Sequence, residues 1–397
     1  MAPTSSYQSP LAITHGHVVL PAEIVSGQSL LVENGKIQGL IPESQIGAQY
    51  ERFDAGGRYV APGLIDIHTH GAMGRSFNEP DEAAWQTITA ENLRRGVTSL
   101  LATLSAAPME ELVACLAFAR EWRKTPRTGS QVLGVHSEGP FLSEGQKGAQ
   151  NPRSIQSLQG GAAEKLLAYA DVLVMLTYAP EIPGALALTD RLRELSIVAA
   201  AGHSSARDRD VLAAYEHGLR HTVHIWSSQS SETREGPWRK PGLLEATLAF
   251  DSLTAEMIAD NRHLPPTLMK LAYKCKGVDR LCVVSDASSA AGLPEGTRFG
   301  ETGMECEVRD GVAILLDQTA FAGSTTLLNQ MIPILVREAG IPLVEAVRMA
   351  SLTPARVIGR ERSKGSLEEG KDADLVLFED DFQAARVMVA GQWIPTA

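Results

Sequence analysis

The two ends of the chain share one pattern of hydrophobic positions. Between residues 11 and 61, short apolar stretches are separated by turns, and Asn34-Gly35 is a typical hairpin turn between two of them. The C-terminal segment repeats this pattern, with short apolar stretches at 374–379 and 386–389 followed by a turn. We therefore expect both ends to form short β-strands.

The middle of the chain has a different pattern, in which short apolar runs alternate with segments long enough for helices. The apolar runs lie at residues 63–68, 97–104, 132–139, 172–180, 197–203, 221–226, 280–287 and 313–317. The clearest helical segments lie at 79–96, 106–124, 204–218 and 265–277. Strands that alternate with helices indicate a parallel sheet, and eight such runs fit a (β/α)8 barrel. A doubly wound open sheet has the same alternation, but no glycine-rich phosphate-binding motif follows the first run.

These patterns predict an α/β fold with two parts. Residues 62–355 are expected to form a TIM-like (β/α)8 barrel that carries the catalytic site. Residues 1–61 and 356–397 are expected to combine into a small β-sandwich domain, so that the barrel is inserted between its two halves. Because barrels build their active sites at the C-terminal ends of the strands, functional residues are expected there.

Composition and charge restrict the class of protein. Hydrophobic residues make up 44% of the chain and charged residues 21%, as in folded globular proteins. The formal net charge of −11 argues against nucleic-acid binding, which needs a basic face. An anionic small-molecule substrate would need a local cluster of basic side chains.

Cysteine usage indicates a reducing compartment. The four cysteines are scattered and form no CxxC pair, so free thiols are expected at Cys115, Cys275, Cys282 and Cys306. The first residues lack the basic start and continuous apolar run of a signal peptide, and no apolar stretch approaches the ~20 residues of a membrane span. We expect a cytoplasmic protein with no membrane partner.

Histidines and carboxylates gather at the ends of the predicted barrel strands. His68 and His70 are two residues apart, so on a strand their side chains point to the same side. Further histidines and carboxylates lie at or just after other apolar runs, at His136, Glu138, His203, His224, His263 and Asp286. Imidazole and carboxylate suit zinc or iron(II), and a catalytic metal lowers the pKa of water toward ~7. The set predicts a divalent-metal site for hydrolysis.

Other histidines fit structural roles. His15 and His17 repeat the HxH spacing, but they lie in the N-terminal β segment, away from any barrel end. His217 and His221 flank the end of a predicted helix, where surface or capping histidines are favourable. His136 shares a predicted strand face with Glu138, so it is expected to support the site rather than to bind metal.

The motifs at these positions resemble those of the amidohydrolase superfamily and, within it, those of the N-acetylglucosamine-6-phosphate deacetylases. The resemblance covers nearly the whole chain. It is carried by PGLIDIHTHG at 62–71, HSEGPFLSEGQKGAQNP at 136–152, AGHSSA at 201–206, TVHIW at 222–226, IADNRH at 258–263, VVSDA at 283–287, FAGST at 321–325, and SLTPARVIG with KGSLEEGKDADLVLF near the C-terminal end. HxEGPF followed by KGAxNP is peculiar to the deacetylase subgroup.

The resemblance implies a ligand set for the metal. Glu138, His203 and His224 fall where the family binds its main divalent ion, for which we expect Zn²⁺ or Fe²⁺. His68 and His70 fall where two-metal members bind a second ion, with Glu138 as the bridge, so one or two ions per subunit are expected. Some two-metal amidohydrolases bridge their ions with a carboxylated lysine on strand four. The predicted fourth run has no lysine, which points away from dihydroorotase-like enzymes.

The resemblance also implies the reaction. Asp286 falls at the general acid/base and is also expected at the metal, and His263 falls at the residue that helps polarise the amide carbonyl. Asp286 would accept a proton from the attacking water and then protonate the leaving amine, so that an N-acetylated amino sugar yields acetate and the free amino sugar. Substrate-binding residues are expected at Ala149, Gln150, Ser227, Ser228, Arg234, His263, Phe321, Ala322 and Gly323.

Two segments depart from the family pattern. KGAxNP usually carries histidine as its variable residue, but here it is Gln150. After the second metal histidine the family usually reads an aromatic residue and then Asn-Ala-Met, whereas TVHIW is followed here by Ser227 and Ser228. These changes leave the metal ligands intact and bear on the sugar. N-acetylglucosamine-6-phosphate is expected, and the galacto epimer, an unphosphorylated hexosamine or another N-acyl substrate stays open.

The segment at 230–242 supplies the basic residues that an anionic sugar needs. Arg234 lies in a TRE context that resembles the family's phosphate-binding arginine, which reaches across a dimer interface, so the resemblance implies a homodimer. Arg239 and Lys240 lie nearby, and a solvated loop is the plainer interpretation of this cluster. A protein that lost its activity and kept the barrel for oligomerisation would usually have lost metal ligands, which are all present here.

Overall fold

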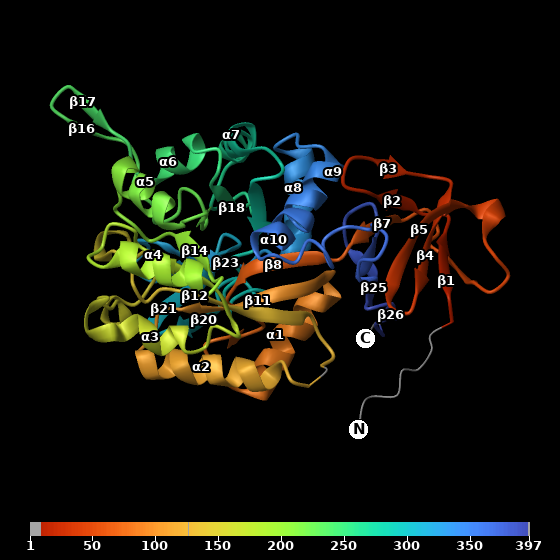
Figure 1. Cartoon of the computed structure of the whole chain (residues 1–397), viewed down its shortest axis with the longest axis horizontal. Helices are drawn as coiled ribbons and strands as arrows, with labels where there is room; N and C mark the ends of the chain where they lie inside the picture. Colours follow the sequence, from red (N-terminus) through yellow and green to blue (C-terminus); the bar gives the residue numbers. More distant parts are fainter. Residues whose placement is uncertain (1–8, 126, 396–397) are drawn as a thin grey trace.

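Eight parallel strands form the central sheet of the computed structural model, which describes residues 9–125 and 127–395 (Figure 1). In sheet order the strands are β8 (Leu64–Thr69), β11 (Val97–Ser105), β12 (Gln131–Glu138), β13 (Leu173–Tyr178), β14 (Val198–Ala201), β15 (His221–Thr222), β18 (Thr254–Ile258) and β19 (Leu281–Val284). The chain after β19 returns to β8, where the Asp286 amide donates to the His68 carbonyl at 2.9 Å. The sheet is therefore nearly closed as a barrel, which confirms the predicted fold class.

Helices surround this barrel (Figure 1). They are α1 (Glu82–Arg94), α2 (Met109–Trp122), α3 (Ala162–Leu167), α4 (Ala185–Glu194), α5 (Asp208–His217), α6 (Leu243–Ala249), α7 (Pro266–Lys276), α8 (Leu328–Arg337), α9 (Leu343–Met349) and α10 (Leu352–Val357). The start of α1 shows how the sequence sets a boundary, because the Asp81 carboxylate accepts the Ala84 amide as an N-cap at 2.9 Å. The four helical segments predicted from the sequence are confirmed.

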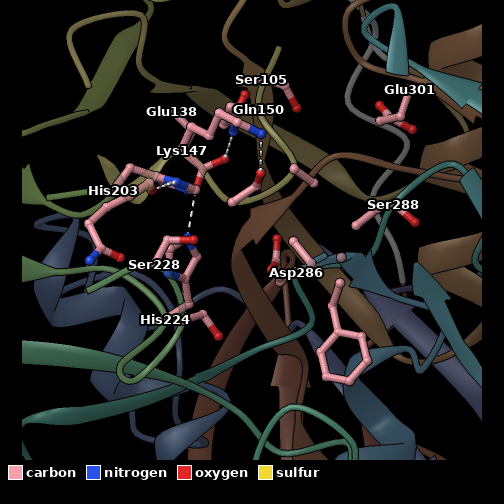
Figure 2. Close-up of a pocket in the computed structure, with 18 of the residues that line it drawn as sticks. Ser105, Glu138, Lys147, Gln150, His203, His224, Ser228, Asp286, Ser288 and Glu301 are labelled. Atoms are coloured by element: carbon pink, nitrogen blue, oxygen red, sulfur yellow. Dashed lines mark hydrogen bonds and ion pairs between the residues drawn. The ribbon is translucent and has the colours of Figure 1, made fainter. Parts of the chain in front are cut away.

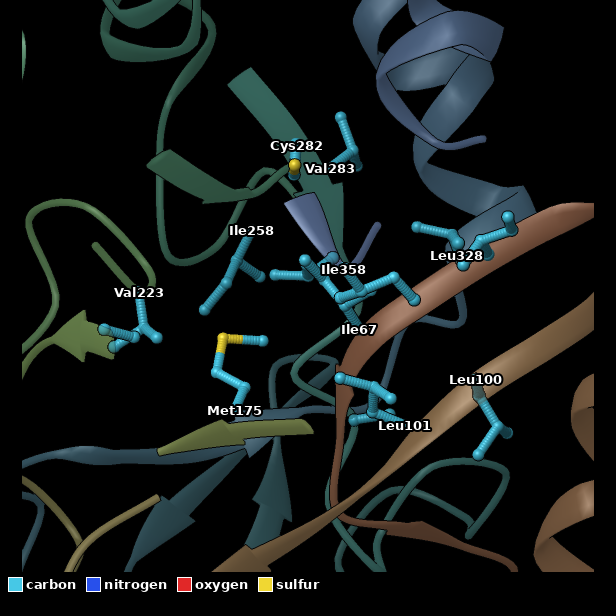
Figure 3. Packing of buried hydrophobic residues seen from close by; sticks show 14 of the residues in the cluster. Ile67, Leu100, Leu101, Met175, Val223, Ile258, Cys282, Val283, Leu328 and Ile358 are labelled. Atoms are coloured by element: carbon cyan, nitrogen blue, oxygen red, sulfur yellow. The ribbon is translucent and has the colours of Figure 1, made fainter. Parts of the chain in front are cut away.

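One apolar core holds the strands in place (Figure 3). Ile67, Met175 and Ile258 come from three different strands and are each at most 1% exposed. All nine residues of β11 are buried, as expected for a strand with helices on one face and the barrel interior on the other. Burial of each such side chain contributes about 1.5–3 kcal/mol to the free energy of folding. The apolar core therefore holds the strands in place, including the strand ends that carry the polar residues.

Strands from both termini form the small β-sandwich that the sequence predicts (Figure 1). One sheet has the order β5-β4-β1-β6, with β1 (Leu11–Thr14), β4 (Gln28–Glu33), β5 (Lys36–Pro42) and β6 (Glu51–Asp54). The other has the order β26-β25-β24-β7-β2-β3, with β2 (His17–Val19), β3 (Ile24–Val25), β7 (Tyr59–Pro62), β24 (Leu375–Phe378), β25 (Ala384–Val389) and β26 (Gln392–Trp393). Asn34 and Gly35 join β4 to β5 with φ of 50° and 74°, which confirms the hairpin.

The division into residues 1–61 with 356–397 and 62–355 stays a prediction. β7 ends at Pro62, and α10 extends across residue 356 while it contacts the barrel strands β8 and β19.

All four cysteines are free thiols, as expected. Among the described helices, none is both long and apolar enough to cross a membrane.

One of the eight predicted barrel strands is wrong. The run at 313–317 lies in β22 (Val312–Leu315), which pairs with β21 (Met304–Arg309) and β23 (Phe321–Ser324). β20 (Arg298–Glu301) completes this antiparallel sheet beside β21. The missing barrel strand is β18, a five-residue segment with the buried Glu256 at its centre. A carboxylate in the middle of a short run hides the apolar signal that the prediction relied on.

The interpretation of His221 as a surface or capping residue is also wrong. His221 begins strand β15 and is fully buried, and its Nε2 lies 3.1 Å from the Glu256 carboxylate. His217 does end helix α5, as predicted, where its ring bonds to Asp190 at 2.7 Å.

The remaining short elements are β9 (Gly71–Ala72), β10 (Arg75–Ser76), β16 (Thr233–Glu235), β17 (Trp238–Lys240) and 3₁₀ turns at Glu43–Gln45, Glu144–Gln146, Pro152–Ser154 and Gln159–Gly161.

Candidate functional site

A pocket of about 570 Å³ opens at the C-terminal ends of the barrel strands (Figure 2). It collects most of the predicted site residues. The predicted residues that line it are His70, Glu138, Ala149, Gln150, His203, His224, Ser227, Ser228, His263, Asp286, Phe321, Ala322 and Gly323. His68 lies fully buried just beneath, with its Nε2 3.2 Å from that of His70.

Three of these residues have an unusual backbone. His203, His224 and Asp286 follow β14, β15 and β19, and each has a positive φ, of 46°, 22° and 47°. Residues other than glycine rarely adopt this conformation, because Cβ then crowds the following carbonyl. Such strain is concentrated at functional sites, where the surrounding structure holds it. The turns bend these side chains over the barrel mouth at the points where the strands end.

Glu138 is the centre of the first group of polar side chains. Its Oε1 lies 2.9 Å from the Nε2 of His203 and 2.7 Å from the Nε2 of His224. Its Oε2 accepts a hydrogen bond of 2.5 Å from the Gln150 amide. Figure 2 shows these side chains pointing toward one another from separate strands and from the loop after β12.

The second group joins His68, His70 and Asp286. One carboxylate oxygen of Asp286 lies 3.5 Å from the Nε2 of His68 and 3.3 Å from that of His70. On its far side, the His70 Nδ1 lies 2.9 Å from the hydroxyl of Ser105. The His68 Nε2 is also 3.6 Å from Glu138, so the two groups are continuous.

The electrostatics of the pocket favour a cation. Burial alone would lower the pKa of His70 and His224, yet the carboxylates raise these pKa values to about 10 and about 9. Burial likewise opposes the charge of Glu138, but His203 and His224 hold its pKa well below the usual range. The buried carboxylates therefore create a strongly negative field at the histidine nitrogens.

These residues fit a divalent metal. The ligand atoms of His68, Glu138 and His224 all lie within 4.8 Å of one another, and so do those of His68, His70 and Asp286. The His224 Nδ1 is buried without a hydrogen-bond partner among the described residues, while its Nε2 faces Glu138. Imidazole nitrogens that converge on carboxylate oxygens are the donor set of zinc and iron(II) sites.

Glu256, which the sequence did not indicate, orients the first histidine of the HxH motif. Its Oε2 lies 2.7 Å from the His68 Nδ1, which donates the hydrogen bond and so leaves Nε2 free to face the pocket. Its Oε1 lies 3.1 Å from His221, and its Oε2 also accepts the His224 amide at 3.3 Å. A carboxylate behind a ligand histidine fixes the tautomer and the direction of the ring. The only sequence signal was an acid inside a short apolar run.

Glu256→Gln should weaken metal binding by about 10- to 100-fold, as expected when a carboxylate behind a ligand histidine is removed. The measurement is metal content after dialysis against chelators of increasing strength. Glu91→Gln is the matched control, because Glu91 is also buried and paired with arginines but lies on α1, away from the pocket. Equal metal retention in the Glu256 and Glu91 variants would contradict this role.

Asp260 orients His263 on the other wall of the pocket. Asp260 Oδ2 lies 2.7 Å from the His263 Nδ1 and accepts the Ser324 hydroxyl at 3.0 Å. Burial opposes the charge of Asp260, but His263 and local amides lower its pKa below the usual range. The His263 ring packs on Phe321 with centroids 5.0 Å apart. The second ring nitrogen of His263 is therefore available to the pocket, and Asp260 is another residue that the sequence analysis missed.

Two glycines let loops approach the site closely. Gly148 has a φ of +55°, and a Cβ there would lie 2.4 Å from the Ser228 hydroxyl. Gly323 has a φ of +80°, and a Cβ there would lie 2.7 Å from the Asp286 carbonyl.

The Gln150 side chain forms hydrogen bonds through both atoms of its amide. Its Nε2 donates to Glu138, and its Oε1 accepts the Ala106 amide at 2.9 Å.

The positive charge at the pocket comes from an unexpected residue. Lys147 lines the pocket, although its place in KGAQNP did not predict a role for it. Arg234 is not in the pocket of its own chain. It lies exposed on the β16–β17 hairpin opposite Arg239, and the hairpin projects from the barrel (Figure 1). His136 bonds to Thr177 at 2.8 Å rather than to Glu138.

Comparisons with known proteins identify the family of the chain. The amidohydrolase family model matches residues 59–394. N-acetylglucosamine-6-phosphate deacetylase of Haemophilus influenzae is 30% identical over 373 residues, covering 94% of this chain and 96% of its own. N-acetylgalactosamine-6-phosphate deacetylase of Escherichia coli O157:H7 is 30% identical over 334 residues, covering 84% and 87%.

Solved structures give the same result. The crystal structure of N-acetylglucosamine-6-phosphate deacetylase from Pasteurella multocida has a TM-score of 0.90 at 29% identity, covering 97% of this chain and 99% of its own. A mutant of the Mycobacterium smegmatis deacetylase in complex with N-acetyl-D-glucosamine-6-phosphate has a TM-score of 0.89 at 29% identity, covering 98% and 100%. The chain belongs to the amidohydrolase family and, within it, to the N-acetylglucosamine-6-phosphate deacetylases.

Proposed function

We propose that this protein hydrolyses the N-acetyl group of N-acetylglucosamine-6-phosphate to give acetate and glucosamine-6-phosphate. The geometry of the site carries the proposal, and the relatives support it. The metal donor set around Glu138 lies in the same pocket as Asp286 and His263, and the deacetylase relatives match nearly the whole chain. Acetate release from this substrate by the metal-loaded protein tests it, and a lack of release would contradict it.

We propose that Glu138, His203 and His224 hold one divalent ion, Zn²⁺ or Fe²⁺, and that His68, His70 and Asp286 provide for a second. Such an ion, when bound, acts as a Lewis acid and lowers the pKa of water toward ~7. The rigid strand ends keep these donors together before the ion binds, and the Glu256 carboxylate supports the arrangement through His68.

Asp286 is the proposed general acid/base. Its carboxylate lies in the pocket and is 8% exposed. Although burial raises its pKa, the neighbouring histidines hold that pKa below the usual range, so the group starts as the carboxylate that a base requires. It would take a proton from the attacking water and return one to the leaving nitrogen.

His263 is proposed to polarise the acetyl carbonyl. Asp260 accepts from Nδ1 and fixes the ring, so Nε2 faces the pocket. As an imidazolium, which carries a proton on both nitrogens, the ring can donate from Nε2 to the carbonyl oxygen as negative charge develops there. A donor that is already oriented costs little reorganisation at the moment of reaction. Phe321, Ala322 and Gly323 lie on the same wall and are proposed to contact the sugar ring.

We propose that two basic residues recognise the 6-phosphate. Lys147 is the lysine that lines the pocket, and its ammonium donates to the Gly148 carbonyl at 3.3 Å, so it can turn to a phosphate. Arg234 lies on an exposed hairpin and is proposed to reach the pocket of a second copy in a homodimer. A cytoplasmic location stays a prediction from the sequence.

Lys147→Met should raise the KM for a 6-phosphorylated sugar by about tenfold or more, because a charge-assisted hydrogen bond contributes about 1.5–3 kcal/mol. The KM for the same sugar without phosphate should change little. Steady-state kinetics on both substrates measure the difference, and Arg209→Met provides a control at an exposed residue outside the pocket. Equal changes for both substrates would rule out a role in phosphate binding.

The galacto epimer is a second candidate substrate. The Escherichia coli O157:H7 relative named for N-acetylgalactosamine-6-phosphate matches this chain at the same 30% identity as the first relative. In addition, Gln150, Ser227 and Ser228 line the pocket where the sequence departs from the family pattern. The two epimers differ in one hydroxyl, and the same metal chemistry serves both.

A further inference from the structure

A second cavity lies at the opposite end of the barrel from the catalytic pocket. It has a volume of about 650 Å³, and its walls are the end of α2 with the start of β12 on one side and segments of the C-terminal region on the other. β12 enters at Gln131 beside this cavity and ends at Glu138 in the catalytic pocket. At about 3.3 Å per residue, the two sites are roughly 20 Å apart, so they are separate.

The lining of this cavity is basic, in contrast to the net charge of −11 for the whole chain. Its basic residues are Arg123, Lys124, Arg127, Arg360 and Lys364, and its acidic residues are Asp372 and Asp374. Both aspartates are used by one lysine. Lys364 Nζ lies 2.5 Å from Asp374 and 3.1 Å from Asp372. The other four basic residues of the cavity, Arg123, Lys124, Arg127 and Arg360, therefore form no ion pair with an acidic residue that lines it.

Two of these four basic residues are neutralised by carboxylates outside the cavity. Lys124 pairs with Glu121 at 2.7 Å, and Arg127 pairs with Glu82. Arg123 and Arg360 are different. Arg123 donates to the backbone carbonyl of Asp171 at 3.2 Å, while the Asp171 carboxylate forms its ion pair with Arg120. In the described ranges, neither Arg123 nor Arg360 forms an ion pair of its own with a carboxylate.

The two guanidiniums also affect each other. Both line the same cavity with exposed side chains. Partial burial and the charge of Arg360 lower the pKa of Arg123, while the Asp171 carboxylate raises it. Two like charges that line one cavity repel each other, and an anion between them relieves this repulsion. Paired guanidiniums match the geometry of a phosphate, which accepts two parallel hydrogen bonds from each fork.

We propose that this cavity binds a small phosphate-bearing molecule, held by Arg123 and Arg360. The volume lies in the range of small-molecule sites, about 300–1,000 Å³. Arg123 follows helix α2 of the barrel, and Arg360 follows α10 on the way to the C-terminal strands. A bound phosphate would therefore connect the barrel to the segment that leads into the small β domain, and it should stabilise the folded protein by mass action.

Pyrophosphate is a suitable probe, because it carries the required chemistry without a sugar or base. Isothermal titration of the full chain should show pyrophosphate binding, and thermal unfolding should show a higher Tm with pyrophosphate than without. Arg123→Gln with Arg360→Gln should weaken this binding at least tenfold and abolish the Tm increase. Arg362→Gln is the matched control, since Arg362 is exposed and does not line the cavity. It should bind as the wild type does.

The catalytic pocket could also take up pyrophosphate, so the titration is repeated on Lys147→Met. Binding that persists in this variant and disappears in the double arginine variant supports the second site. Three results would overturn the proposal: no binding to the wild type at millimolar pyrophosphate, unchanged binding in the double arginine variant, or binding that depends on Lys147 alone. The variants change exposed side chains, and their Tm without pyrophosphate verifies that they fold.

Discussion

Asp286→Asn should retain its fold and the ion proposed at Glu138, His203 and His224, and lose about 10²–10⁴-fold in turnover, the usual contribution of a general acid–base group. The amide has nearly the size of the carboxylate, so packing at the barrel mouth is preserved. It cannot accept a proton from water, and it cannot deliver one to the leaving nitrogen. Steady-state acetate release, together with metal content for each preparation, measures the loss.

The control for this variant is another carboxylate of the same pocket. Glu144 lines the pocket from an exposed position, and the metal donor groups do not include it. Glu144→Gln should therefore change turnover far less than Asp286→Asn does. If the Asp286 variant kept most of its activity at full metal content, the proton-transfer role would have to be assigned to another residue.

Lys364→Met should destabilise the protein by about 3–5 kcal/mol, because its removal leaves the buried Asp374 carboxylate without its charged partner, whereas Asp372 keeps Lys36. Lys364 is 7% exposed and lies between Asp372 and Asp374. Asp374 also accepts the Ala390 amide at 2.7 Å, so its carboxylate is fixed near β25 and cannot turn to solvent. Urea unfolding of the two proteins side by side measures the difference.

Lys36→Met is the control for the lysine variant. Lys36 pairs with the same Asp372 at 2.6 Å, but its side chain is 46% exposed. Exposed pairs contribute about 0–1 kcal/mol, so this variant should be close to wild type. A loss below 1 kcal/mol for Lys364→Met would show that the buried network does not hold the terminal segment as described.

The sequence predicted the barrel well because its signals are local. Runs such as 97–104 are apolar on both faces, which is typical of strands buried between a barrel interior and helices. The sequence did not predict β18, because its central residue, Glu256, is charged. The charge of Glu256 is balanced by hydrogen bonds from His68 and His221, which come from other strands. The run at 313–317 is a real strand, but its sequence does not reveal which sheet it joins.

The candidate site shows the same limit. The histidines and carboxylates at the strand ends were predictable, because a parallel barrel brings its C-terminal strand ends to one face. Their orienting partners were not predictable in this way. Asp260 is three residues from His263, but its role depends on a hydrogen bond that only the turn after β18 creates. Arg234 could be identified by resemblance, while its position outside the pocket of its own chain required the structure.

Acetate release by the metal-loaded protein from a small substrate panel tests the central claim most directly. The panel holds N-acetylglucosamine-6-phosphate, its galacto and manno epimers, and the same three sugars without phosphate. We predict a strong preference for a 6-phosphorylated sugar, with N-acetylglucosamine-6-phosphate the best of the six. Activity on unphosphorylated sugars alone, or on none of the six, would contradict the proposed function and indicate a different N-acyl substrate.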